Sequence, residues 1–106
     1  MRTIYVISLY LLFTSCGVPP KYQDEKLKEY FHKQWEQELK NYPEFSTYLG
    51  DLRYNDMLTD MSLEAVHKRH IQTKKSYEEL LVINRTQLSK EYKLYYDLYA
   101  DKLQKE

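Results

Sequence analysis

Three side chains that can bind metals recur at intervals of three residues: Glu64, His67 and His70. On a helix, residues three apart are neighbours, so each adjacent pair could share a metal ion, although the helical turn separates Glu64 from His70. The HExxH motif of zinc peptidases is missing here, because Lys68 follows His67 where that motif requires glutamate. A histidine on an apolar stripe is usually a hydrogen-bonded core residue. We prefer that structural interpretation of His67 and His70 to a metal site.

Two other groups of polar side chains could bind ions. Gln34 and Glu38 fall within the apolar arc of the helix expected around them, where a buried carboxylate would need a cation such as Arg53. The simpler interpretation, which we prefer, is that Glu38 faces a groove open to water. Residues 51–60 carry oxygen ligands of the kind that calcium uses, but lack the alternation and the glycine of an EF-hand. Helix caps and turns account for these side chains, which are Asp51, Asn55, Asp56 and Asp60.

Cys16 is the only cysteine, and its sequence context indicates a covalent modification. Phe13-Thr14-Ser15-Cys16 resembles the lipobox of bacterial lipoproteins, in which a cysteine preceded by small residues is lipidated and becomes the new N-terminus. A lone cysteine can form no disulfide within the chain, so the alternative is an ordinary thiol behind a simple cleavage site. The motif predicts a lipid anchor on Cys16 and a place in the bacterial cell envelope. Gly17, in place of the aspartate that commonly retains lipoproteins at the inner membrane, favours the outer membrane.

The residues before Cys16 have the composition of a signal peptide. Arg2 gives a positive start, and residues 4–13 form an apolar run interrupted only by a serine. A helix of this length rises about 15 Å, half of a bilayer core of roughly 30 Å, so the run is too short to span a membrane. We therefore expect a signal peptide over residues 1–15, a stiff proline-containing tether over 16–22 and a helical segment over 23–106.

The composition limits the fold and the partners of the chain. Its 106 residues allow one small domain, and only two glycines and three prolines disfavour a sheet-rich fold with many turns. The 16 basic and 16 acidic side chains leave no basic excess, which argues against nucleic acid as a partner. An all-α fold is the expectation.

Hydrophobic periodicity predicts three amphipathic helices. The first begins after Asp24 as N-cap and ends before Pro43, which opens a short helical turn closed by Gly50. Its apolar residues are Leu27, Tyr30, Phe31, Trp35, Leu39 and Tyr42. Residues 51–60 are expected to form a loop.

The second helix begins after Ser62 as N-cap. Its apolar stripe consists of Leu63, Val66, Tyr77, Leu80 and Leu81, and Met61 and Val66 occupy the positions of a hydrophobic staple.

The third helix, beginning near Ser89, is apolar on two sides. One face carries Tyr92, Tyr95, Tyr96, Tyr99 and Leu103, whereas Leu94 and Leu98 lie on another face. A helix with two apolar faces needs neighbours on two sides. Two other helices supply only one such layer, and the sequence stops at Glu106 without a glycine or proline to end the helix. We therefore expect these helices to be an incomplete portion of a larger helical domain.

The most specific pattern lies between the first two long helices. It consists of residues 43–56 (PEFSTYLGDLRYND), followed by Leu58, Asp60 and Ser62. With the aromatic pair Phe31 and Trp35 before it and Leu80, Ile83 and Leu88 after it, this stretch resembles the N-terminal signature of the bacterial domain-of-unknown-function 885 family. The resemblance covers residues 24–103, which would be the opening part of a family domain several times longer.

The resemblance implies an origin among helical, often secreted lipoproteins that are similar to zinc metallopeptidases. In that family an HExxH helix lies far downstream, and the N-terminal helices are expected to wall the substrate cleft. No position of this chain can receive the zinc ligands or the general base, so zinc and a peptide substrate are implied only for a full-length protein. The expected function is that of a lipid-anchored, non-catalytic N-terminal fragment. The alternative is a small envelope lipoprotein that acts as a helical protein-interaction module.

Overall fold

The computed structural model describes residues 20–106, which form helices joined by short loops. The elements are α1 (Pro20–Asn41), α2 (Pro43–Tyr48), the 3₁₀ helix η1 (Leu52–Tyr54), α3 (Leu63–Leu81), the 3₁₀ helix η2 (Arg85–Gln87) and α4 (Lys90–Lys105). No strand occurs within this range. The expectation of an all-α fold with three long helices is confirmed.

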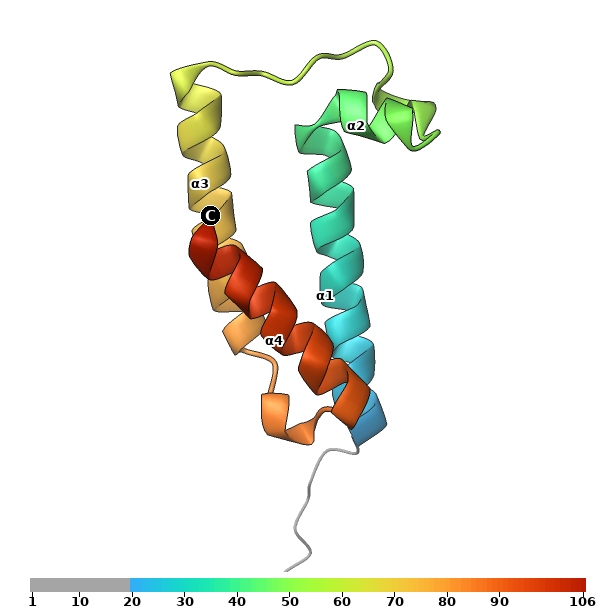
Figure 1. Cartoon of the computed structure of the whole chain (residues 1–106), viewed down its shortest axis with the longest axis vertical. Coiled ribbons are helices and arrows are strands. Elements are labelled where there is room, and N and C mark those ends of the chain that lie inside the picture. Colours follow the sequence, from blue (N-terminus) through green and yellow to red (C-terminus); the bar gives the residue numbers. More distant parts are fainter. Residues whose placement is uncertain (1–19) are drawn as a thin grey trace, which may run out of the picture.

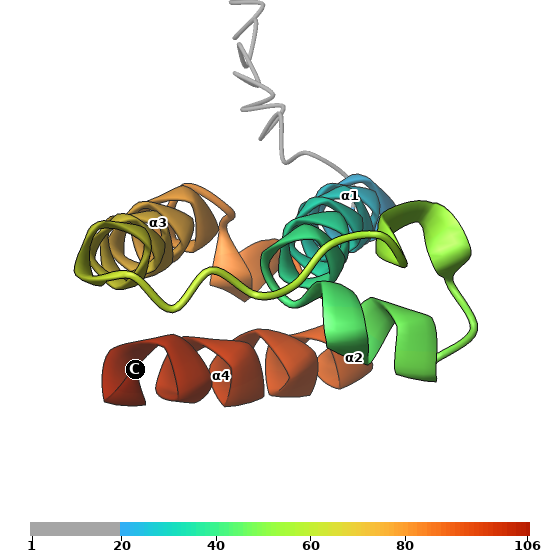
Figure 2. The ribbon, with the colours of Figure 1, turned by 90° about the horizontal axis from the view of Figure 1, so that it is seen from above.

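The three long helices form two layers. Helices α1 and α3 lie side by side and run in opposite directions, and α4 crosses obliquely over both (Figure 1). Figure 2 shows α4 in a separate layer beneath α1 and α3, with α2 at the end of α1 on the same side as α4. Only one face of the α1–α3 layer is therefore covered by another helix of the described chain.

The apolar core is concentrated toward the end of the molecule at which α1 begins. Its buried members come from all three long helices and from the segment around η2: Leu27, Tyr30, Leu80, Ile83, Leu88, Tyr96 and Leu103. The buried phenol of Tyr30 donates a hydrogen bond to the carbonyl oxygen of Ser76 across the α1–α3 contact, at 2.8 Å. Burial, and then the neighbouring Tyr99, raise the pKa of Tyr30, so it stays protonated and keeps this bond.

Helix α1 begins five residues earlier than expected. Pro20 is its first residue, a position where the fixed φ of proline favours a helix and its missing N–H costs nothing. The prediction that Asp24 is the N-cap is therefore wrong, and residues 20–22 of the expected tether are helical. The Asp24 carboxylate instead accepts a hydrogen bond from the backbone N–H of Ser89, at 2.9 Å. The signal peptide and Cys16 lie outside the described residues.

The other predicted helix boundaries are confirmed by their local geometry. Pro43 is the first residue of α2, and Gly50 follows its end with a positive φ of 89°. The N–H groups of Gly50 and Asp51 bond to the carbonyls of Thr47 and Ser46, both at 3.0 Å, which is a Schellman motif. Ser62 caps α3 by accepting from the N–H of Ala65 at 3.2 Å, as expected.

The predicted apolar stripe of α3 is buried only toward its C-terminal end. Leu80 is fully buried, but 89% of Leu63 and 44% of Val66 are exposed. The physical reason is that the side-chain hydrogen bonds between α3 and α1 are made by Gln72 and Ser76, further along the helix, which leaves the first turns of α3 uncovered. On α4, Leu94 and Leu98 are also exposed, so the second apolar face of that helix has no neighbour among residues 20–106.

Candidate functional site

Polar side chains bridge α1 and α3 next to the core and away from it. Ser76 donates to the side-chain oxygen of Gln34 at 2.7 Å, and the Asn41 amide donates to Gln72 at 3.2 Å. Gln37 in turn donates to the Asn41 oxygen at 3.1 Å. Because side-chain amides, and not interlocking apolar side chains, bridge the helices, a space of about 450 Å³ opens between them. We call this space the polar groove.

Charged side chains line the polar groove. Glu38 lies in its wall, which confirms the simpler interpretation of that carboxylate as facing a groove open to water. His70 also lines the groove. Both His70 and His67 are exposed to solvent. The preferred interpretation of both histidines as core residues is therefore wrong, because no apolar layer covers that part of α3. Residues 20–106 contain no group of three side chains that could hold a metal ion.

A second depression, which we call the aromatic groove, lies between α1, α2 and α4. Its aromatic and aliphatic lining residues are Phe31, Trp35, Phe45, Tyr95, Leu98 and Tyr99. Trp35 meets Phe45 edge to face with ring centroids 6.2 Å apart, and Phe31 meets Tyr99 in the same way at 5.2 Å. Aromatic pairs favour this geometry. The two parts of the groove measure about 440 and 410 Å³.

The apolar side chains of the aromatic groove remain accessible to solvent. Trp35 is 46% exposed, Phe45 41% and Leu98 61%, although the helical periodicity placed Trp35 on the core face of α1. Partial burial raises the pKa of Tyr99 to about 12, so its hydroxyl is a neutral hydrogen-bonding group at physiological pH. The Lys102 ammonium lies 5.5 Å from the centre of the Tyr99 ring and adds a cation–π contact at the rim.

The polar and aromatic grooves adjoin each other. Four residues line both of them: Gln34, Glu38, Tyr99 and Lys102. Large apolar side chains of a ligand would fit the aromatic part, whereas amides, a carboxylate and an ammonium could pair with peptide groups or charges in the polar part. The combination suits an extended peptide segment.

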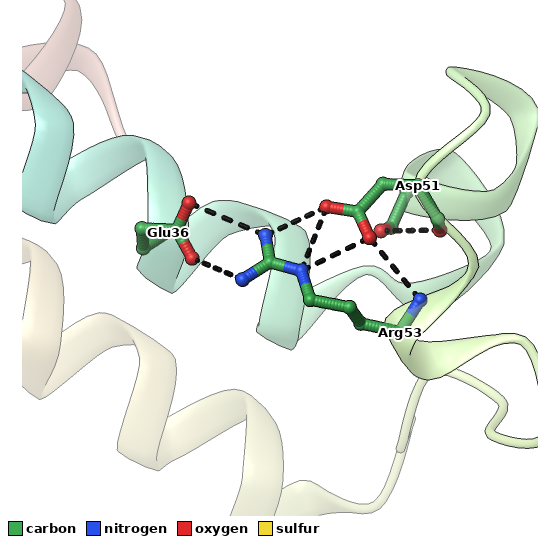
Figure 3. A network of polar contacts seen from close by, with 4 residues as sticks. Glu36, Asp51 and Arg53 are labelled. Carbon is green, nitrogen blue, oxygen red and sulfur yellow. Dashed lines mark hydrogen bonds and ion pairs between the residues drawn. The ribbon is translucent and has the colours of Figure 1, made fainter.

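An ion network holds α2 and η1 against α1, as Figure 3 shows. The Arg53 guanidinium donates to both carboxylate oxygens of Glu36, at 2.8 and 3.2 Å, and to Asp51 at 2.6 Å. Hydrogen bonds from Arg53 lower the pKa of both carboxyls, and these two acids raise the pKa of Arg53. The network fixes the orientation of α2, which carries Phe45 of the aromatic groove. Arg53 therefore pairs with Glu36. The sequence had suggested Glu38 as the partner of Arg53.

The segment after η1 is held by capping and turn interactions. The carboxylate of Glu44 accepts two hydrogen bonds from Thr59, one from the backbone N–H at 2.9 Å and one from the side-chain hydroxyl. Asp60 accepts from the N–H of Ser62 at 2.9 Å, and its carbonyl accepts from Arg69 at 2.7 Å. Asp60 therefore makes a turn contact of the expected kind, as does Asp51, which accepts from the backbone N–H of Arg53 at 3.1 Å. The expected loop contains one element that the sequence pattern missed, the 3₁₀ turn η1.

Comparison of the chain with protein-family models, curated proteins and solved structures gave no match. The resemblance to the domain-of-unknown-function 885 family therefore stays a prediction. Among the helices of residues 20–106, none is long and apolar enough to cross a membrane.

Proposed function

We propose that this chain is a lipid-anchored helical module that binds an extended peptide segment in the adjoining polar and aromatic grooves. In this proposal it is the N-terminal part of an envelope protein similar to zinc metallopeptidases, where α1–α4 wall the peptide cleft. The chain contributes binding surface and no catalytic group. Cys16 carries the lipid that holds it to the outer membrane.

The observation that carries the proposal is the accessible aromatic surface beside a row of side-chain amides. Burying partly exposed aromatic and leucine side chains against a ligand is favourable by about 25 cal/mol per Å² of apolar area. The amides of the polar groove can exchange hydrogen bonds with a peptide backbone, which gives orientation in addition to affinity. Such a surface suits a segment with apolar side chains at intervals.

Trp35 provides a direct assay, because it is the only tryptophan of the chain and lies in the aromatic groove. We expect its fluorescence to change when the protein is titrated with short peptides that carry leucine or phenylalanine. Matched peptides with serine at those positions should leave it unchanged.

Two neighbouring leucines of α4 supply a matched pair of variants. Leu94 is 56% exposed and Leu98 is 61% exposed, but only Leu98 lines the aromatic groove. We expect Leu98→Glu to weaken peptide binding and Leu94→Glu to leave it unchanged, with equal helix content in circular dichroism. Equal effects of the two substitutions on binding would contradict the proposed use of the groove.

The lipid anchor and the origin of the chain have separate tests. Replacing Cys16 with Ser should release the protein from membranes, and an unchanged membrane fraction would contradict lipidation. A continuation of the reading frame or a frameshifted one that encodes HExxH would support the metallopeptidase-like protein. An unrelated gene downstream would support the alternative, in which the same groove binds a separate envelope protein.

A further inference from the structure

The two ends of the described molecule carry opposite charges, although the sequence is neutral. One end consists of residues 20–28 of α1 and residues 82–93, which connect α3 to the first turn of α4 (Figure 1). These two ranges have six basic and three acidic side chains: Lys21, Lys26, Lys28, Arg85, Lys90 and Lys93 against Asp24, Glu25 and Glu91. A fourth acid, Asp97 of α4, pairs with Arg85 at 2.6 Å, which leaves an excess of two basic groups. We call this end of the molecule the basic end.

The acids of the basic end are engaged in contacts within the protein. Asp24 binds the N–H of Ser89, Glu25 pairs with Lys28 at 2.8 Å, and Glu91 accepts from the Tyr95 hydroxyl at 2.5 Å. The opposite end, residues 43–64, has the reverse balance. Its five acids and one base are Glu44, Asp51, Asp56, Asp60, Glu64 and Arg53. Lys68 and Arg69 from the next turn of α3 lie beside Asp60 and Glu64, and an acidic excess of two remains.

The basic end also exposes apolar side chains. Val82, the C-cap that follows α3, is 83% exposed, and Leu81, the last residue of α3, is 55% exposed. Tyr22, in the first turns of α1, is 50% exposed, and the Lys26 ammonium lies 4.9 Å from the centre of its ring. Basic groups together with a tyrosine and aliphatic side chains are the composition of a protein surface that contacts a lipid headgroup layer.

The short connection to Cys16 restricts where the basic end can be. Because α1 begins at Pro20, only residues 17–19 separate the helix from the cysteine. An extended chain spans at most about 3.6 Å per residue, so the start of α1 lies within about 14 Å of Cys16. At physiological ionic strength the potential of a charged membrane surface decays over a Debye length of about 8 Å. The limit of about 14 Å is less than two Debye lengths, so lipidation of Cys16 keeps the start of α1 where the membrane charge still acts on it.

We propose that the basic end lies against an anionic phospholipid surface and that the acidic end points away from it. This inference rests on the lipid anchor of the proposed function. It orients the chain, because Lys21, Lys26 and Lys90 are attracted to anionic headgroups while the acids of residues 43–64 are repelled. Trp35 lies fifteen residues after the start of α1, which corresponds to about 22 Å at 1.5 Å per residue. An upright molecule therefore presents the aromatic groove to the aqueous phase, accessible to a peptide segment.

A pair of cysteine variants tests the orientation. Val82 at the basic end and Leu58 at the opposite end, within residues 43–64, are apolar residues of similar accessibility, exposed by 83% and 80%. Because the only natural cysteine is the lipidated one in this proposal, Val82→Cys or Leu58→Cys adds the single reactive thiol. Each lipidated variant is labelled with an environment-sensitive fluorophore and reconstituted into vesicles of phosphatidylglycerol and phosphatidylcholine that contain a lipid-borne quencher.

We expect the probe at position 82 to shift to the blue and to be quenched by the lipid, and the probe at position 58 to do neither. Vesicles of phosphatidylcholine alone, 1 M salt, or the added substitutions Lys21→Glu and Lys90→Glu should reduce the difference between the two probes. Equal quenching of the two probes on anionic vesicles would overturn the inference.

Mass spectrometry of the purified protein separates this inference from the proposed anchor. Equal quenching of a protein that carries lipid on Cys16 would refute only the orientation. A protein without lipid on Cys16 would refute the anchor and, with it, the orientation.

Discussion

Helix α3 offers a direct test of how unevenly the apolar residues of this protein contribute to its stability. Leu80 and Leu63 belong to the same predicted apolar stripe, but Leu80 is fully buried whereas 89% of Leu63 is exposed. Both lie in the same helix, and leucine and alanine have similar helix propensities. Replacing each with alanine therefore compares burial alone.

The expected magnitudes follow from the exposed fractions. Leu→Ala removes three carbon atoms, and at about 0.8 kcal/mol per buried methylene their transfer accounts for roughly 2.4 kcal/mol at a fully buried site. The cavity left around Leu80 adds to this, so we expect Leu80→Ala to lower the free energy of unfolding by about 3 kcal/mol. Leu63→Ala should change it by less than about 0.5 kcal/mol, because little of that side chain leaves water on folding.

Urea denaturation followed by circular dichroism measures both values on the purified protein. A loss of about 3 kcal/mol is a large part of the stability of a domain of this size, so the Leu80→Ala midpoint should fall strongly while the slope stays constant. Losses of similar size for the two variants would refute the reasoning, because the exposed half of α3 would then be packed against something in solution.

Three further predictions concern single contacts and activity. Tyr30→Phe should lower the free energy of unfolding by about 1 kcal/mol in the same assay, because the carbonyl of Ser76 loses its buried donor, whereas no loss would mean that the bond is not formed. The lowered pKa values of Glu36 and Asp51 predict a contribution to stability that is present above their ordinary values of 4.5 and 3.8 and is lost as the pH falls through the lowered ones. Arg53→Met should therefore flatten the acid limb of a stability–pH profile, and an unchanged limb would show that the network is not populated. The purified mature chain should show no zinc-dependent peptidase activity, and stoichiometric zinc together with turnover of a peptide library would contradict this.

The helix boundaries could be predicted from sequence because local residues determine them. Pro43 begins α2, Gly50 adopts the positive φ of a Schellman motif, and Ser62 caps α3 through its own side chain. Each signal acts within four residues and does not depend on tertiary contacts. Asp24 failed as a predicted cap because Pro20 provides an earlier start, which left its carboxylate free to bind Ser89, 65 positions along the chain.

The grooves could not be predicted because periodicity identifies an apolar face but not what covers it. Trp35 and Val66 lie on the expected faces of α1 and α3, yet both remain partly exposed. Outside the apolar core, the contact between those helices is made by Gln34, Asn41 and Gln72, residue types that a binary pattern assigns to the solvent side. Arg53 illustrates the same limit, since its choice of Glu36 over Glu38 depends on how η1 folds back onto α1.

The uneven distribution of contacts has a consequence for how the grooves work. Toward the start of α1 the helices share the apolar core, whereas toward its end α1 and α3 are joined by neutral hydrogen bonds such as Asn41 to Gln72. A typical neutral hydrogen bond contributes only about 0.5–1.5 kcal/mol, and its groups can bond to water instead. Local opening of that half therefore costs far less than unfolding of the core, so amide protons in the first turns of α3 should exchange faster than those around Leu80. The polar groove lies between helices that can move apart while the core stays folded, which allows its width to adjust to a bound segment.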